Sequence, residues 1–211
     1  MSYTREDIAQ ALDLAVLKPD ASCEDVYHAA WFVQHERIAS LCVASCHIKL
    51  ARRYTNRVCS VIGFPHGNTL PSVKLHEAVG AIGHGAKELD VVVNYGAFLC
   101  GYADFLQTEL DLIVKLARKY DVTVKAILEI CYYTDDQIRD ACRLCVNAKV
   151  DYVKTSTGFG PGNATPEAVA LMLETVKGKA LVEASGGIKT YADAARYLDM
   201  GCMRIGSASL N

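Results

Sequence analysis

The sequence predicts an α/β fold, a (β/α)₈ barrel with a short extra helix at its N-terminus. Eight short apolar runs recur along the 211 residues, and helical periodicity precedes the first run and separates each run from the next. The mean of about 26 residues per unit is near the lower limit for such a barrel. An open doubly wound sheet is the main alternative, but no GxGxxG motif follows the first run, which weakens it.

The composition is that of a compact globular protein, and we expect a single domain over residues 1–211. The chain is 51% hydrophobic and 22% charged, with a formal net charge of -2. The lack of basic excess argues against nucleic-acid binding. No apolar run reaches the roughly 20 residues of a membrane helix, and a start containing Glu6 and Asp7 is no signal peptide. We therefore expect a cytoplasmic protein without nucleic-acid or membrane partners.

The strands are predicted from the apolar runs, each bounded by polar or turn-forming residues. In order they are Asp13–Leu17, Ser40–Ala44, Val58–Gly63, Glu88–Asn94, Val122–Ile130, Asp151–Thr155, Ala180–Ala184 and Cys202–Gly206.

Helices are predicted before the first strand and between the strands, and their end signals support several of them. Thr134 and Gln137 fit a capping box. Thr165 followed by Pro166 gives an N-cap and a proline at the first helical position. Gly201 falls where a helix should stop. The predicted helices are Arg5–Leu12, Glu24–Glu36, Cys46–Tyr54, Ser72–Gly83, Tyr102–Lys119, Asp135–Asn147, Pro166–Val176 and Tyr191–Asp199.

The nine cysteines cannot all form disulfides with one another, because nine is odd. Most lie in apolar runs, where a free thiol behaves as a small hydrophobic group. Cys142 and Cys145 have the only metal-like spacing, but no second CxxC or histidine cluster accompanies them. We expect free thiols in a reducing compartment and no metal.

Four charged residues interrupt the apolar strands: Asp90, Lys125, Lys154 and Glu183. In a barrel, alternate residues point inward and the chemistry lies at the C-terminal ends of the strands. A charge facing the interior is costly unless it is paired or functional. Lys154 precedes a hydroxyl- and glycine-rich loop, so it is the candidate nucleophile for a carbonyl substrate. From periodicity alone, a surface lysine at the end of an exposed strand is an equally open interpretation.

The chain resembles the deoxyribose-phosphate aldolases over essentially its whole length. Lys154-Thr155-Ser156-Thr157-Gly158 is similar to the Schiff-base strand of that family. Further matching segments, in the same order as in the family, are Asp13–Asp20, Val61–Gly67, Glu88–Asn94, Ile127–Glu129, Ala184–Ile188 and Arg204–Gly206.

The resemblance implies a class I aldolase without metal or other cofactor. Such an enzyme cleaves 2-deoxy-D-ribose 5-phosphate to acetaldehyde and glyceraldehyde 3-phosphate. By the resemblance, Lys154 forms the Schiff base and Asp90 moves protons together with water. An inner-rim carboxylate that only pairs a lysine is the alternative for Asp90. Members of the family are often dimers or larger, so we expect a homodimer or higher homo-oligomer.

Glu183 departs from the family pattern, which has a second lysine at this position. A carboxylate near Lys154 favours the ammonium form and raises the pKa of the amine, the wrong direction for nucleophilic attack. Three interpretations stay open. Glu183 acts as a general acid or base in a slow aldolase, Lys125 supplies the missing cation, or the protein has lost catalysis and binds a ligand. A Lys154 ammonium held by Glu183, with no room for a carbonyl carbon, would favour ligand binding alone.

The predicted phosphate end follows the last strands, where barrels often bind phosphate with loop backbone and a helix N-terminus. Gly158 and Phe159 are expected to close the third side. Lys189 stands where the family commonly has arginine, and it lacks the bidentate contact of a guanidinium. Ala15 and Leu14 are smaller departures, from threonine and histidine. The predicted binding residues are Gly158, Gly186, Gly187, Lys189, Gly206, Ser207 and Ser209.

Two other functions remain as alternatives to the aldolase. The first is a catalytically degenerate relative that binds a sugar phosphate on the same scaffold. The second is another phosphate-binding barrel lyase or synthase that uses Lys154 on a different carbonyl compound.

Overall fold

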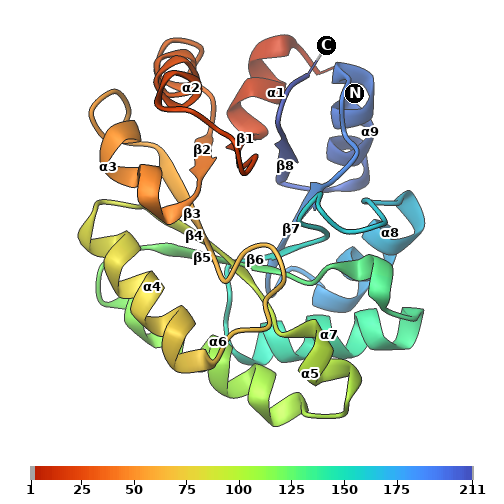
Figure 1. Ribbon diagram of the computed structural model, residues 1–211. Helices are drawn as coiled ribbons and strands as arrows, with labels where there is room; N and C mark the ends of the chain where they lie inside the picture. The colour runs from red at the N-terminus through yellow and green to blue at the C-terminus, as the bar shows by residue number, and fades with distance from the viewer. Residues whose placement is uncertain (1–2, 211) are drawn as a thin grey trace.

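Eight parallel strands close into a barrel in the computed structural model, which describes residues 3–210 and confirms the predicted fold (Figure 1). The strands pair in sequence order, and β8 returns to pair with β1. They are β1 (Leu12–Val16), β2 (Ser40–Val43), β3 (Val58–Ile62), β4 (Glu88–Val92), β5 (Thr123–Ile127), β6 (Tyr152–Lys154), β7 (Leu181–Ser185) and β8 (Arg204–Ser207).

Helices surround the barrel, and the extra helix α1 lies beside α9, close to both chain ends (Figure 1). The Arg5 guanidinium lies 5.2 Å from the centre of the Tyr191 ring at this contact. The helices are α1 (Arg5–Ala11), α2 (Cys23–His35), α3 (Ile48–Ala51), α4 (Pro71–Gly83), α5 (Tyr95–Leu99), α6 (Ala103–Arg118), α7 (Asp135–Asn147), α8 (Pro166–Val176) and α9 (Tyr191–Met200). Within residues 3–210, none of them is both long and apolar enough to cross a bilayer.

The predicted boundaries were right to within one or two residues for most elements, with three clear exceptions. The helix predicted over Cys46–Tyr54 is a 3₁₀ turn (Ser45–His47) followed by the short α3. The strand predicted to reach Ile130 ends at Ile127, because Glu129 adopts a left-handed backbone with φ 56°. Helix α5 was not predicted, and the Asn94 side chain caps it by accepting a hydrogen bond from the Ala97 N–H.

The apolar core lies between the strands and the helices, whereas the barrel interior is largely polar. Leu89, Val91 and Val153 alternate with the charged residues of their strands, and all three are fully buried in the outer core. Register pairs Asp90 with Lys125 and Lys154 with Glu183 on neighbouring strands. Because side chains alternate along a strand, these four charged residues face the same enclosed space.

Candidate active site

Lys154 ends β6 with its amine directed at three carboxylates. Only 6% of the residue is exposed. Its Nζ lies 2.5 Å from Asp90 Oδ2, 2.6 Å from Glu183 Oε1 and 3.7 Å from Asp13 Oδ2. The structure therefore brings together the three predicted catalytic residues, Lys154, Asp90 and Glu183, and it places Lys154 in an enclosed site rather than on an exposed strand.

Lys125 lies in the same enclosed space and is fully buried. Its Nζ is 2.5 Å from Asp13 Oδ2, 3.2 Å from Asp90 Oδ1 and 3.2 Å from Glu183 Oε2. Glu88 Oε2 lies 2.8 Å away, and the other oxygen of Glu88 pairs with Arg204 at 2.9 Å. The two lysines thus share their carboxylate partners instead of facing each other.

Two lysines and three carboxylates make up the centre of the site: Lys125, Lys154, Asp13, Asp90 and Glu183. When all five are ionised, their net charge is -1. Burial lowers the pKa of Lys154, but attraction to Asp90, Glu183 and Asp13 outweighs it and holds that pKa well above its usual range. The effect agrees in direction with the expectation from Glu183. We conclude that Lys154 is an ammonium at neutral pH in the unliganded site.

The pKa of Glu183 is raised and that of Asp90 is lowered, although the two carboxylates share the same surroundings. Burial raises the pKa of Glu183, and Lys125 and Lys154 only partly offset that rise. For Asp90, burial also raises the pKa, but the same two ammonium groups outweigh it, so the pKa is lowered. Among these carboxylates, Glu183 is therefore better suited than Asp90 to accept a proton.

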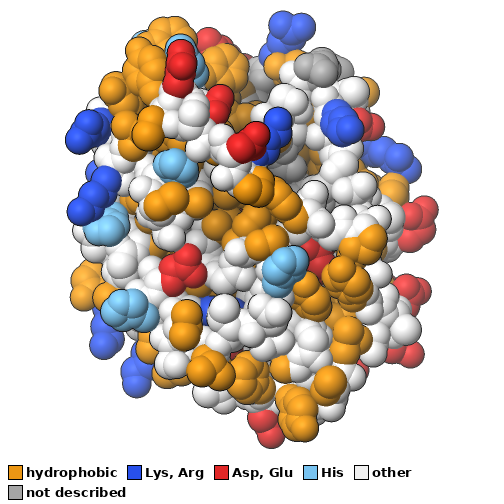
Figure 2. Space-filling model, in the orientation of Figure 1, with side chains coloured by type: hydrophobic (Ala, Val, Ile, Leu, Met, Phe, Trp, Pro, Cys, Tyr) orange, Lys and Arg blue, Asp and Glu red, His pale blue; other side chains and the backbone are white. Residues whose placement is uncertain are grey.

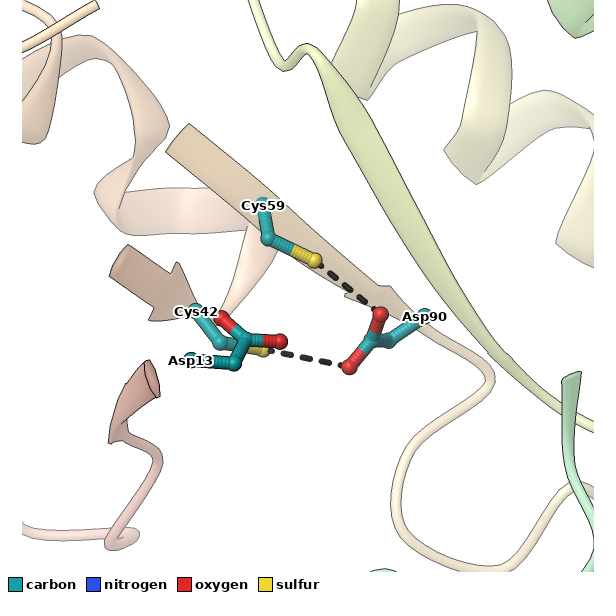
Figure 3. A group of neighbouring side chains, drawn as sticks. All are labelled: Asp13, Cys42, Cys59 and Asp90. Atoms are coloured by element: carbon teal, nitrogen blue, oxygen red, sulfur yellow. Dashed lines mark hydrogen bonds between the residues drawn. The ribbon is translucent and has the colours of Figure 1, made fainter. Parts of the chain in front are cut away.

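Asp13, Cys42, Cys59 and Asp90 form a compact group in the barrel interior (Figure 3). Their potential ligand atoms lie within 4.8 Å of one another. The Cys59 thiol donates to Asp90 Oδ1 at 3.1 Å, and the Cys42 thiol to Asp90 Oδ2 at 3.7 Å. A hydrogen bond with Cys59 lowers the pKa of Cys42, but burial and the nearby carboxylates of Asp90 and Asp13 outweigh it and raise that pKa to about 11.

This group is a poor fit to a metal ion despite its residue types. Both carboxylates already hold an ammonium at 2.5 Å, and both thiols are protonated donors. A metal would have to displace two cations and two thiol protons. Cys142 and Cys145 lie on α7, buried among apolar side chains, and belong to no potential ligand cluster in the described part of the chain.

Side-chain hydroxyl groups form hydrogen bonds between the ends of β6, β7 and β8 and the loops that follow them, at the mouth of the barrel. The Thr155 hydroxyl donates to the Ser185 carbonyl at 2.8 Å and accepts from the Ser185 N–H at 2.9 Å. The Ser185 hydroxyl in turn donates to the Ser156 carbonyl at 2.6 Å. Ser207 donates to the Ile188 carbonyl at 2.6 Å, which links the last two loops.

The predicted phosphate glycines meet at this mouth. Gly158, Gly186 and Gly187 all have left-handed backbones, with φ of 81°, 87° and 74°. A Cβ on Gly158 would lie 3.9 Å from the Gly186 Cα, so the loops after β6 and β7 approach closely. A Cβ on Gly187 would lie 2.8 Å from the Asn163 side chain, so glycine is required there.

The other predicted binding residues have different positions. A Cβ on Gly206 would lie 2.9 Å from Glu183 Oε1 and 3.4 Å from Lys154 Cε, so this glycine makes room for the ion pair inside the barrel. The Ser207 hydroxyl is engaged with the backbone of Ile188 and Ser209. Lys189 and Ser209 are exposed beside these loops.

Sequence reasoning did not assign roles to four residues of the site. Asp13 stands at the first residue of its predicted strand, where a charge reads as an edge residue. Glu129 and Asn163 lie in loops whose course the sequence does not define. Ser156 is fully buried, and its hydroxyl has no hydrogen-bond partner among the described residues. An unpaired buried hydroxyl two residues after Lys154 is a candidate ligand contact.

The charged centre is buried, since Asp13, Asp90, Lys125 and Glu183 have no exposed surface and Lys154 has very little. In Figure 2, charged side chains lie mainly around the periphery of the face, and hydrophobic ones gather near its middle. Phe64 and Phe159, from the loops after β3 and β6, make an edge-to-face contact with ring centres 5.1 Å apart.

Comparisons with known proteins agree with this architecture. A sequence model of the DeoC/LacD family of aldolases matches residues 8–208. The deoxyribose-phosphate aldolase of Thermococcus gammatolerans is 41% identical over 209 residues, covering 96% of this chain and 93% of that protein. That of Caldanaerobacter subterraneus is 38% identical over 208 residues, covering 96% and 90%.

Solved structures give the same result. An aldolase named QR15 has a TM-score of 0.92 at 37% identity, covering 96% of this chain and 91% of that one. A deoxyribose phosphate aldolase from Aeropyrum pernix, described as a unique tetramer, has a TM-score of 0.90 at 32% identity, covering 97% and 88%.

Proposed function

The chain belongs to the DeoC/LacD family of aldolases, and we propose that it is a class I aldolase that cleaves 2-deoxy-D-ribose 5-phosphate to acetaldehyde and D-glyceraldehyde 3-phosphate. The observation that carries the proposal is the Lys154 amine at the end of a barrel strand, within 2.6 Å of two carboxylate oxygens. A buried lysine at this position in a barrel can form a Schiff base once it is neutral, and the flanking carboxylates offer acceptors for the proton that it must lose.

The first step requires Lys154 to lose a proton. Transfer to Glu183, whose pKa is raised, gives a neutral amine without exchanging a proton with solvent. The amine then attacks the C1 aldehyde of the open-chain sugar, and loss of water gives the iminium. Glu183 can return its proton to the departing hydroxyl, which is general acid catalysis.

The carbon–carbon bond breaks in the second step. Asp90, with water, removes the proton of the C3 hydroxyl, and the C2–C3 bonding electrons pass into the iminium to form an enamine. Glyceraldehyde 3-phosphate leaves with the new carbonyl at the former C3. The proton that Asp90 and water received from the C3 hydroxyl then passes to the enamine carbon, and hydrolysis of the resulting iminium releases acetaldehyde and free Lys154.

The cost of Glu183 is a slow first step. The neutral amine must form against the attraction of three carboxylates, and each unit of pKa rise costs about 1.4 kcal/mol, or tenfold in the fraction of reactive amine. Lys125 is no substitute for the family's second lysine, because it binds the same carboxylates that hold Lys154. We therefore expect an active but impaired aldolase.

The phosphate group is proposed to bind between the loops after β6, β7 and β8. The loops after β6 and β7 approach each other at three glycines with positive φ: Gly158, Gly186 and Gly187. Backbone N–H groups in such turns can bind anions. Exposed Lys189 adds a positive charge, and Ser207 and Ser209 set the shape of the last loop. Gly206 contributes by leaving space for Lys154.

We further propose that residues 1–211 form one domain that works in the cytoplasm as a homodimer or larger homo-oligomer. The tetrameric relative from Aeropyrum pernix supports the oligomer. The proposed partner is the sugar phosphate alone, without cofactor, nucleic acid or membrane.

A second function is favoured by one observation, the Lys154 ammonium held by Asp90, Glu183 and Asp13. If no carbonyl compound can displace this pairing, the protein binds a sugar phosphate without cleaving it.

Borohydride trapping separates the two functions. The protein is incubated with deoxyribose 5-phosphate or acetaldehyde and borohydride at several pH values up to about 9, with the Lys154→Arg variant as control. An aldolase gains a reduced adduct on the peptide containing Lys154, and the variant gains none. Calorimetric binding of the sugar phosphate with no adduct at any pH would contradict catalysis and support the binding protein.

A further inference from the structure

Glu129 is a buried carboxylate at the barrel mouth with no part in the proposed Schiff-base steps. It lies two residues beyond β5 and is 2% exposed. Its backbone is left-handed, with φ 56°, just before a 3₁₀ turn (Ile130–Tyr132). This conformation is unfavourable for a residue other than glycine and is retained where the surroundings require it.

The Glu129 carboxylate holds the loop that follows Lys154. The Thr157 N–H donates to both carboxylate oxygens at 3.3 Å, and the Thr157 hydroxyl donates to Oε2. The same hydroxyl accepts from the Phe159 N–H at 3.0 Å. A Cβ on Gly160 would lie 3.1 Å from the carboxylate carbon, so the loop backbone packs directly on Glu129.

These contacts fix the Ser156–Thr157 and Gly158–Phe159 peptide groups. Thr157 and Phe159 have their N–H groups engaged, so the Gly158 segment between them has a defined orientation. This segment faces Gly186, at the place where the phosphate is proposed to bind. Phe159 is held at the same time against Phe64.

We propose that Glu129 is a positioning residue that orients the Thr157–Gly160 loop for recognition of the substrate phosphate. The inference rests on the proposed function. Glu129 affects binding of the substrate phosphate and has little effect on the reaction at Lys154. The groups that contact the carboxylate are the Thr157 N–H and hydroxyl and the Cys131 thiol, whose sulfur lies 4.0 Å from Oε1.

The test compares Glu129→Ala and Glu129→Gln with the wild-type protein on two substrates, deoxyribose 5-phosphate and deoxyribose without phosphate. Glu129→Ala should lower the preference for the phosphorylated substrate at least tenfold, through a higher KM, with kcat changed less than threefold. Glu129→Gln keeps an acceptor for Thr157 and should keep the preference within about threefold. Glu174→Ala, an exposed glutamate on α8, is the matched control.

Calorimetric binding of inorganic phosphate gives a readout that needs no turnover. Its Kd should rise at least tenfold in Glu129→Ala and in Thr157→Val, which breaks the same contact from the other side if Glu129→Ala does not fold. An equal loss on both substrates, an unchanged phosphate Kd in the variants, or no phosphate binding by the wild type would overturn the inference. A wild type that binds phosphate but forms no Lys154 adduct would overturn only the aldolase proposal.

Discussion

At the scale of single residues, Glu183 sets the charge balance around Lys154. It places a third carboxylate among two ammonium groups, which leaves an excess negative charge in an enclosed space. Within this set, its own raised pKa makes it the natural acceptor of the Lys154 proton. In the proposed mechanism, the same residue therefore holds the Lys154 ammonium in place and accepts its proton.

Replacing Glu183 with lysine should raise the cleavage rate at least tenfold at pH 7. The substitution removes an attraction that holds the proton on Lys154 and adds a like charge that lowers the pKa of the amine. One unit of pKa accounts for tenfold. Steady-state kcat/KM for deoxyribose 5-phosphate measures the effect, with circular dichroism as a check on folding. An unchanged or lower rate would show that proton transfer through Glu183 contributes more to the rate than its attraction for the Lys154 ammonium takes away.

The pH dependence of kcat/KM distinguishes internal proton transfer from loss to solvent. Transfer from Lys154 to Glu183 conserves protons, so the wild-type profile should be nearly flat between about pH 6.5 and 9. In Glu183→Gln the proton must leave to solvent. Because the Lys154 pKa lies above this range, kcat/KM should then rise about tenfold per pH unit. A slope of one in the wild type would exclude Glu183 as the acceptor.

At the scale of elements, buried polar contacts connect helices, strands and loops that lie far apart in the sequence. Hydroxyls of Thr155, Ser185 and Ser207 join the loops after β6, β7 and β8. Lys74 of α4 and Glu109 of α6 form a fully buried ion pair at 2.6 Å, and the Lys74 amine also donates to the Val92 carbonyl at 2.7 Å. These contacts hold the outer helices against β4, the strand that carries Asp90.

Lys74→Met should lower the free energy of unfolding by about 3–5 kcal/mol, because it leaves Glu109 buried without a counter-charge. The double variant Lys74→Met with Glu109→Leu should recover much of that loss, since no buried charge remains. Urea denaturation of the single and double variants at pH 7 measures both values. A double variant less stable than the single one would show that the pair itself stabilises the fold.

At the scale of the whole molecule, the fold buries some of the nine thiols and leaves the others exposed to solvent. Five are buried, including Cys42 and Cys59 in the interior, and four are exposed. All nine are free. Burial raises the pKa of Cys145 and that of Cys59 well above their usual range, which keeps the reactive thiolate form scarce.

Thiol titration should therefore proceed in two stages. In the native protein, a chromogenic disulfide reagent should modify four thiols quickly: Cys23, Cys46, Cys100 and Cys131. The other five should react only after denaturation in guanidinium. Peptide mapping identifies the modified residues, and fast modification of Cys42 or Cys59 in the native state would contradict the enclosed interior.

The sequence by itself determined the order of strands and helices, the barrel and the inward-facing charges. Hydrophobic periodicity is local, so α7 and α8 were predicted with the boundaries that the structure has. Strand parity identified Asp90, Lys125, Lys154 and Glu183, because a charge in an apolar strand has few other uses.

Only the tertiary structure decided what these charges contact. Lys125 and Asp13 are 112 residues apart in the chain, yet their side chains lie 2.5 Å apart. The place of Gly206 beside Lys154 and the hold of Glu129 on Thr157 depend on how eight strands close around one axis. Local sequence encodes which way a side chain points along its strand, whereas the distance between side chains on different strands is fixed only when the barrel closes.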